Sequence, residues 1–191
     1  MDPVFTLQWP EYLLAARLQT LFPKSKHFSV LVPASRQEKG IDLALVRKRP
    51  GGTSRVALLQ VKASRTYSPE PPKRETTRHF RFHTWFNTFE PSDHADFFLL
   101  MGMYAPDAAQ TKRVGPQWYR DVTLLFTYAD MKKFIDECIT KGNKPEKMFG
   151  FGFNDDSEVI QTRGDAKRKY RDFTEHLLVK QLSILKQHLE D

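Results

Sequence analysis

The chain has 191 residues, of which 40% are hydrophobic and 13% aromatic, and its 30 Lys and Arg residues against 23 Asp and Glu residues give a net charge of +7. This composition can fill the core of one domain, which excludes a disordered basic protein, and the single cysteine, Cys138, excludes a disulfide framework and a multi-thiolate zinc site. Because no apolar run is long enough to span a membrane and the first residues do not resemble a signal peptide, we expect one soluble, cytoplasmic domain over residues 1–191 with no membrane partner.

Hydrophobic patterning predicts one helix and then three strands in the first third of the chain. The helix is expected over residues 8–22, since Pro10 suits a first helical turn and Pro23 ends the segment. Strands are expected over residues 27–32, 41–47 and 55–62. A Pro-Gly-Gly turn separates the last two strands, which therefore predict a β-hairpin.

The remaining two thirds of the chain are predicted to mix buried strands with helices. Residues 64–77 are Pro-rich and charged, which is typical of a loop or flap, and residues 79–89 fit either a strand or a helix. Buried strands are expected over residues 95–104 and 121–127, and helices over residues 130–140 and about 168–190. This order of elements predicts an α/β fold with no domain boundary.

Positive charge is concentrated in less than a third of the chain. Residues 24–81 contain fourteen Lys and Arg but four Asp and Glu, a local net charge of +10 against +7 for the whole chain. A clustered basic surface is typical of proteins that bind a polyanion. The alternative is that charges such as Arg47, Lys48 and Arg49 only solvate a turn.

Three polar side chains are predicted to meet at one end of the otherwise apolar hairpin. If the turn is centred on Gly51, Asp42 pairs with Gln60, and Lys62 shares the face of Gln60 because side chains alternate along a strand. A register slip of one residue would move Asp42 to the opposite face. Carboxylate and amide oxygens suit Mg²⁺, and a nearby lysine can reach the metal-bound water or a phosphate, which favours metal-assisted phosphodiester hydrolysis. The alternative is a cross-strand ion pair between Asp42 and Lys62.

Glu11 is predicted to face the core. It recurs at helical spacing with Leu7, Leu14, Leu18 and Leu21, which form one apolar stripe of the first helix. The alternative is an exposed carboxylate that the helix dipole favours in the first turn.

Gly40-Ile41-Asp42, followed after seventeen residues by Gln60-Val61-Lys62, resembles the core motif of the PD-(D/E)XK (restriction endonuclease-like) nuclease superfamily in a Gln-x-Lys form. Glu11 matches a Glu that members commonly carry on the preceding helix. The resemblance covers residues 8–63 and implies a restriction endonuclease-like core, in which helices flank a mixed central β-sheet. Two departures are Ile41 in place of Pro and Gln60 in place of an acid; the loss of one negative charge weakens metal affinity and favours a one-metal mechanism.

The resemblance also implies roles for the motif residues. Asp42 would be the main metal ligand, Gln60 would bind through its amide oxygen and Val61 through its carbonyl. Lys62 would assist the nucleophile, and Glu11 would hold a water or a second metal. The implied activity is that of a Mg²⁺-dependent endodeoxyribonuclease, with Mn²⁺ as a substitute metal.

Other readings of the chain stay open at this point. A non-catalytic nucleic-acid-binding module that retains the nuclease fold is one, and a protein-interaction domain, supported by the many aromatic residues, is another. Double-strand cleavage needs two active sites, which a homodimer would supply. The residues expected to contact DNA phosphates are Lys39, Arg65, Arg74, Arg78 and Arg81. The aromatic residues expected to fill the core, with base stacking as the alternative, are Phe80, Phe82, Trp85, Phe86 and Phe89.

Overall fold

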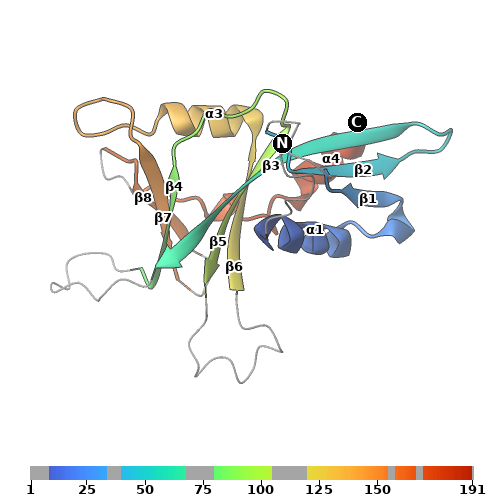
Figure 1. Cartoon of the computed structure of the whole chain (residues 1–191), viewed down its shortest axis with the longest axis horizontal. Coiled ribbons are helices and arrows are strands. Elements are labelled where there is room, and N and C mark those ends of the chain that lie inside the picture. The colour runs from blue at the N-terminus through green and yellow to red at the C-terminus, as the bar shows by residue number, and fades with distance from the viewer. Residues whose placement is uncertain are drawn as a thin grey trace, which may run out of the picture.

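The computed structural model describes residues 9–33, 40–67, 80–104, 120–154, 158–166 and 170–190. In chain order the elements are α1 (Trp9–Leu21), the 3-10 turn η1 (Lys24–Lys26), β1 (Phe28–Leu31), β2 (Leu43–Lys48), β3 (Ser54–Tyr67), β4 (Phe82–Asn87), β5 (Phe97–Tyr104), β6 (Arg120–Thr127), α3 (Tyr128–Asp136), β7 (Met148–Phe153), β8 (Val159–Arg163), the 3-10 turn η2 (Thr174–His176) and α4 (Leu182–Glu190). The predicted α/β class is confirmed, since helices flank one large and mostly antiparallel sheet (Figure 1). None of the described helices is long and apolar enough to cross a membrane.

The long strand β3 joins two parts of the sheet. Its first residues pair antiparallel with β2, the stretch from Leu59 to Arg65 pairs parallel with β5, and Thr66 and Tyr67 pair with β4. Among the described strands β3–β5 is the only parallel pair, so the sheet is mixed as predicted. β3 therefore extends five residues beyond Lys62, into the segment expected to be a loop, and its end carries the chain across to β4, β7 and β8 (Figure 1).

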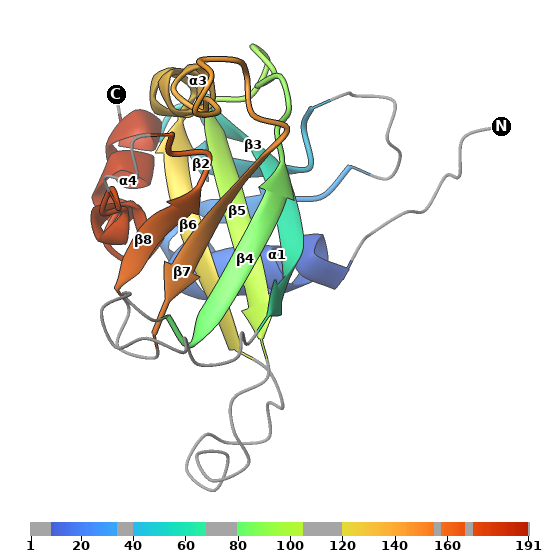
Figure 2. The same ribbon diagram turned by 90° about the vertical axis from the view of Figure 1, so that its left-hand side faces the viewer.

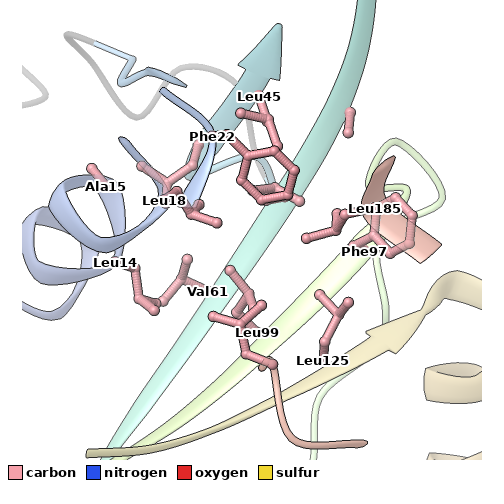
Figure 3. Close-up of a cluster of buried hydrophobic side chains, with 14 of the residues drawn as sticks. Leu14, Ala15, Leu18, Phe22, Leu45, Val61, Phe97, Leu99, Leu125 and Leu185 are labelled. Atoms are coloured by element: carbon pink, nitrogen blue, oxygen red, sulfur yellow. The ribbon is translucent and has the colours of Figure 1, made fainter. Parts of the chain in front are cut away.

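One hydrophobic core lies between the helices α1 and α4 and the strands β1, β2, β3, β5 and β6. Leu14 and Leu18 of α1 point from the helix toward side chains such as Val61 and Leu99 on the strands (Figure 3). Glu11, Leu14 and Leu18 are all buried, which confirms that the apolar stripe of the helix faces the core and that Glu11 lies on it.

A second, phenylalanine-rich core fills the space between β5–β6 and the strands β4, β7 and β8, which lie in front of them in Figure 2. The helix α3 closes one end of this core with Met131 and Phe134. Thr127 caps α3, because its hydroxyl accepts the Asp130 N–H at 3.2 Å. The cap explains why the helix begins at Tyr128, earlier than the prediction of residues 130–140.

The strands β7 and β8 were not predicted. The first of them, β7, reads Met-Phe-Gly-Phe-Gly-Phe, and glycine is depleted in strands. A Cβ built on Gly150 would lie 2.2 Å from Cδ1 of Trp85 on the neighbouring strand β4, so glycine is needed for the close approach of that ring. The glycines therefore make room for aromatic rings within a strand instead of ending one.

The prediction of a C-terminal helix over residues 168–190 is wrong for its first half, since the described helix begins at Leu182. The preceding residues run along strand edges instead. Gln161 donates its N–H to the Arg171 carbonyl at 2.8 Å, Phe173 donates to Val159 at 2.8 Å, and Leu178 donates to Thr123 at 2.9 Å. Backbone groups of β6 and β8 thus gain partners from this segment, an advantage that local helical periodicity cannot reveal.

Cys138 is buried beside Gln161, whose Nε2 lies 3.9 Å from its Sγ. Burial raises the pKa of the Cys138 thiol to about 12, despite the opposing charge of Arg171. The thiol is therefore protonated and shielded at neutral pH, and we expect it to react with a thiol reagent such as DTNB only when the protein unfolds. Labelling rates measured across a urea titration would test this, and fast labelling of the folded protein would contradict it.

Candidate metal and nucleic-acid site

The register of the β2–β3 hairpin is the one that the sequence predicts. Leu43 pairs with Leu59 and Lys48 pairs with Ser54 across the turn. Continued by one position, this register would place Asp42 opposite Gln60. The predicted register is therefore confirmed as far as Leu43 and Leu59; the regular ladder ends there, because the Asp42 N–H donates to the carbonyl of Leu59, the partner of Leu43.

Asp42 lies just before β2, where the strand begins to pair with β3. Its N–H donates to the Leu59 carbonyl at 2.9 Å, and its carboxylate Oδ2 accepts the Val61 N–H at 2.7 Å. In the regular ladder the Val61 N–H would bond a backbone carbonyl of the partner strand. The Asp42 carboxylate occupies that place, so it is held at the edge of β3 where β2 is no longer paired. Since the N–H and C=O of one strand residue are directed to the same edge, the Val61 carbonyl is directed there too.

Gln60 is the buried member of the group. Its side chain is 7% exposed, and its Oε1 is buried with no hydrogen-bond partner among the residues that the structure describes. Leaving a buried acceptor unpaired costs about 1–3 kcal/mol. A cation beside this oxygen and the Asp42 carboxylate would offset that cost, and both groups are oxygen ligands of the kind that Mg²⁺ prefers. The residues present therefore fit a magnesium ion.

Lys62 follows on the same face of β3 as Gln60. Its Nζ lies 5.2 Å from the centre of the Phe89 ring, in a cation–π contact. Within the described part of the chain Lys62 forms no ion pair with Asp42, so the alternative of a cross-strand ion pair is not found. The ammonium group instead borders a pocket of about 480 Å³, together with Ser64, Trp85 and other residues of β3 and β4.

Glu11 lies on the other side of the sheet from Gln60 and Lys62. α1 packs on the face that carries Val61, and Leu14, one helical turn after Glu11, lies close to Val61 (Figure 3). Gln60 is in register with Phe98, which belongs to the opposite core. The structure thus places Gln60 and Lys62 on one face of β3 and the Asp42 carboxylate on the Val61 N–H at the adjacent edge, and it leaves Glu11 on the opposite face, with Val61.

The acidic side chain at this edge of β3 is that of Asp42, whose carboxylate accepts the Val61 N–H. Among the described residues, no group of three or more His, Cys, Asp and Glu side chains is placed to share a metal ion. The residues that could hold a metal here are therefore Asp42 through its carboxylate, Gln60 through its amide oxygen and Val61 through its carbonyl. Such a set carries one negative charge.

The predicted basic segment divides into two groups in the fold. At the hairpin tip Arg47 forms an ion pair with Glu190 of α4 at 2.7 Å, and Arg49 donates to the Glu190 carbonyl. Arg65 is exposed on β3. The hairpin-tip residue Arg55 lies five residues before Gln60 and ten before Arg65, which is about 17 Å and about 33 Å along an extended strand. The tip charges thus lie far from the site and partly serve to bind α4.

Of the expected phosphate contacts, Arg65 lies three residues beyond Lys62 on β3, so its side chain is on the opposite face of the strand from Gln60 and Lys62. Arg81 precedes β4, and its guanidinium lies 5.2 Å from the centre of the Phe82 ring. Lys39, Arg74 and Arg78 lie outside the described residues.

Two aromatic residues beside the site behave differently from the prediction. Phe80, Phe82 and Phe86 are buried as expected, whereas Trp85 is 37% exposed and borders the pocket next to Lys62. Tyr67, which the sequence placed in a loop, lines the same pocket. The sequence Phe-His-Thr-Trp-Phe-Asn of residues 82–87 does not alternate in polarity, so the exposure of Trp85 follows only from the alternating burial along β4 in the structure.

Comparison with known proteins adds no further assignment to these residues. No family model, curated protein or solved structure gives a significant match to the chain. The function must therefore be inferred from the chemistry of the edge of β3 and from the motif that it carries.

Proposed function

We propose that the protein is a metal-dependent nuclease that hydrolyses DNA phosphodiester bonds with Mg²⁺-activated water. The observation that carries the proposal is that the Asp42 carboxylate accepts the N–H of Val61, the residue between Gln60, whose buried Oε1 has no hydrogen-bond partner among the described residues, and Lys62, whose ammonium lies beside Phe89. Apolar hairpins have no structural need for such a group of complementary polar side chains.

The arrangement of elements supports a restriction endonuclease-like core. The helix α1 precedes the β1–β2–β3 meander, Asp42 follows the turn at Gly40, and Gln60-Val61-Lys62 lies on the next strand. The central sheet is mixed and is flanked by helices, as the resemblance to the PD-(D/E)XK superfamily implies. Glu11 on α1 is buried on the Val61 face of the sheet. To bind a metal held by Gln60, its carboxylate would have to reach past the edge of β3 that β2 leaves unpaired.

In this proposal Asp42, Gln60 and the Val61 carbonyl hold one Mg²⁺. When bound, the ion supplies a water of lowered pKa and offsets negative charge on the phosphate. Lys62 carries a compact positive charge that is not used in an ion pair within the described residues, so it can bind a phosphate oxygen or orient the attacking water. The neutral Gln60 in place of an acid leaves the site with less negative charge to repel the DNA backbone.

Cleavage assays with paired variants test the proposal. We expect the wild-type protein to cleave plasmid, junction or single-stranded DNA in Mg²⁺ or Mn²⁺, and Asp42→Asn and Lys62→Met to lower the rate about 100-fold or more. Asp42→Asn should also weaken Mn²⁺ binding in titration calorimetry, while keeping an oxygen acceptor for the Val61 N–H and hence the fold. Asp93→Asn and Lys132→Met, which change exposed residues outside the site, are matched controls and should cleave like wild type.

Equal cleavage by the wild-type protein and both site variants would overturn the nuclease assignment. A second candidate, a non-catalytic nucleic-acid-binding module, is favoured by the presence of one carboxylate in the group of Asp42, Gln60 and Lys62. That candidate predicts salt-sensitive DNA binding with neither Mn²⁺ binding nor cleavage.

A further inference from the structure

The strand β4 presents polar and aromatic side chains to the outside of the molecule. Along it Phe82, Thr84 and Phe86 are buried, whereas Trp85 and Asn87 are exposed. This alternation is that of a strand with one face in the core and one face open. Trp85 is thus placed on the open face by the same pattern that buries its neighbours.

Trp85 forms a stacked pair with Tyr67 of the neighbouring strand β3. The ring centres are 5.1 Å apart with an angle of 27° between the planes, and the two residues are 37% and 48% exposed. On the other side of β4, Trp85 pairs with Gly150 of β7, so no side chain stands between its ring and that strand. The pair therefore offers a flat aromatic surface on the open face of the sheet.

The aromatic pair and the proposed catalytic lysine border the same pocket. Lys62, Tyr67, Trp85, Asn87 and Phe89 all line the volume of about 480 Å³ between β3 and β4. The pocket lies where β3 has left β2 and has not yet reached its pairing with β4 at Thr66. Asn87 adds an exposed amide, which can donate to and accept from the edge of a base.

We infer that Tyr67 and Trp85 form a stacking platform for the bases of an unpaired nucleic-acid strand whose phosphates meet Arg65 beside the pair and Lys62 at the pocket that the pair borders. The identity of the ligand as nucleic acid rests on the proposed function. Arg65 is exposed two residues before Tyr67 and thus on the same side of the strand. Aromatic rings stack on the flat faces of bases. In a duplex those faces are covered by the neighbouring base pairs, so the platform selects single-stranded DNA or an unpaired flap.

Binding measured without cleavage tests the platform. Fluorescence anisotropy of a labelled oligo-dT strand in EDTA should show tighter binding than that of a duplex of equal length, because thymine runs have no pairing to break. Trp85→Leu and Tyr67→Leu should each weaken the binding of the single strand about 5- to 150-fold, the range for losing one stacked base. Trp85→Phe and Tyr67→Phe keep a ring and should bind within a few-fold of wild type, which separates stacking from misfolding.

The helix α1 supplies a matched control. Trp9 and Tyr12 form a second exposed stacked pair, with ring centres 5.9 Å apart and 53% and 55% exposure, and neither lines the pocket. Trp9→Leu and Tyr12→Leu should leave the binding of the single strand unchanged. Equal losses from both pairs, no loss from either, or tighter binding of the duplex would each overturn the platform.

The outcome is separable from that of the nuclease proposal. Loss of strand binding on Trp85→Leu with no cleavage by the wild-type protein would support the platform and contradict the nuclease. Metal-dependent cleavage that Asp42→Asn abolishes, with strand binding insensitive to Trp85 and Tyr67, would support the nuclease and contradict the platform. Absence of any nucleic-acid binding would contradict both.

Discussion

Replacing Gln60 by methionine is expected to stabilise the fold while abolishing metal-dependent cleavage. The Gln60 side chain is 7% exposed and its Oε1 has no hydrogen-bond partner in the described part of the chain, a cost of about 1–3 kcal/mol that an apolar side chain of similar length avoids. The same change removes the amide oxygen that the proposed metal would use. Opposite shifts in stability and activity are the signature of a residue retained for its chemistry.

Gln161 provides a matched control for this experiment. It is 2% exposed, and its Oε1 is also buried with no partner within the described ranges, but it lies in β8 beside Cys138. Gln161→Met should leave cleavage and Mn²⁺ binding unchanged. Its gain in stability should be smaller, because its Nε2 donates to the Arg163 carbonyl at 3.2 Å and that bond would be lost.

Urea unfolding and Mn²⁺ titration of both methionine variants measure the two effects. The expected result for Gln60→Met is a higher midpoint with an unchanged denaturant slope, no Mn²⁺ binding and a cleavage rate lowered about 100-fold or more. Wild-type cleavage and metal binding in Gln60→Met would show that the unpaired oxygen is not a ligand.

The part of the site that the sequence predicts correctly is the part fixed by local geometry. The glycines of the turn between β2 and β3 set the register, and hydrophobic alternation sets the face, so the pairing of β2 with β3 as far as Leu43 and Leu59, one residue short of Asp42 and Gln60, follows from nearby residues alone. The burial of Glu11 likewise follows from one helical stripe. The separation of Glu11 from Gln60 and Lys62 cannot be predicted in this way, because helical periodicity indicates which side of a helix is buried but not which face of the sheet the helix covers.

The elements that the sequence misses are those that depend on partners distant in the chain. β7 is a strand despite Gly150 because the Trp85 ring, from another strand, fills the space that a side chain would occupy. The segment before α4 is extended because Arg171 and Phe173 bond to β8. In both places long-range packing and backbone pairing outweigh local propensity.

Gly40→Ala is expected to disrupt the fold and the site together. Gly40 has φ +86°, and a Cβ there would lie 2.5 Å from both Cβ and Oγ of Ser92, which belongs to the segment between β4 and β5. Left-handed backbone costs an alanine about 1–2 kcal/mol, and overpacking adds about 1–3 kcal/mol. The total loss of about 2–5 kcal/mol falls two residues before Asp42, so the carboxylate should shift from the Val61 N–H and cleavage should fall.

Gly52→Ala separates the two costs of the Gly40 substitution. Gly52 has φ +84° in the hairpin turn, and a Cβ there would meet nothing within 4 Å, so this variant should lose only the backbone term of about 1–2 kcal/mol and keep full activity. Ser92→Gly in the Gly40→Ala background removes both clashing atoms and should recover the overpacking term. The four proteins of that double-mutant cycle, measured by urea unfolding, should therefore show a coupling energy of about 1–3 kcal/mol between positions 40 and 92. Additive effects would mean that the Ser92 side chain does not limit the space at position 40.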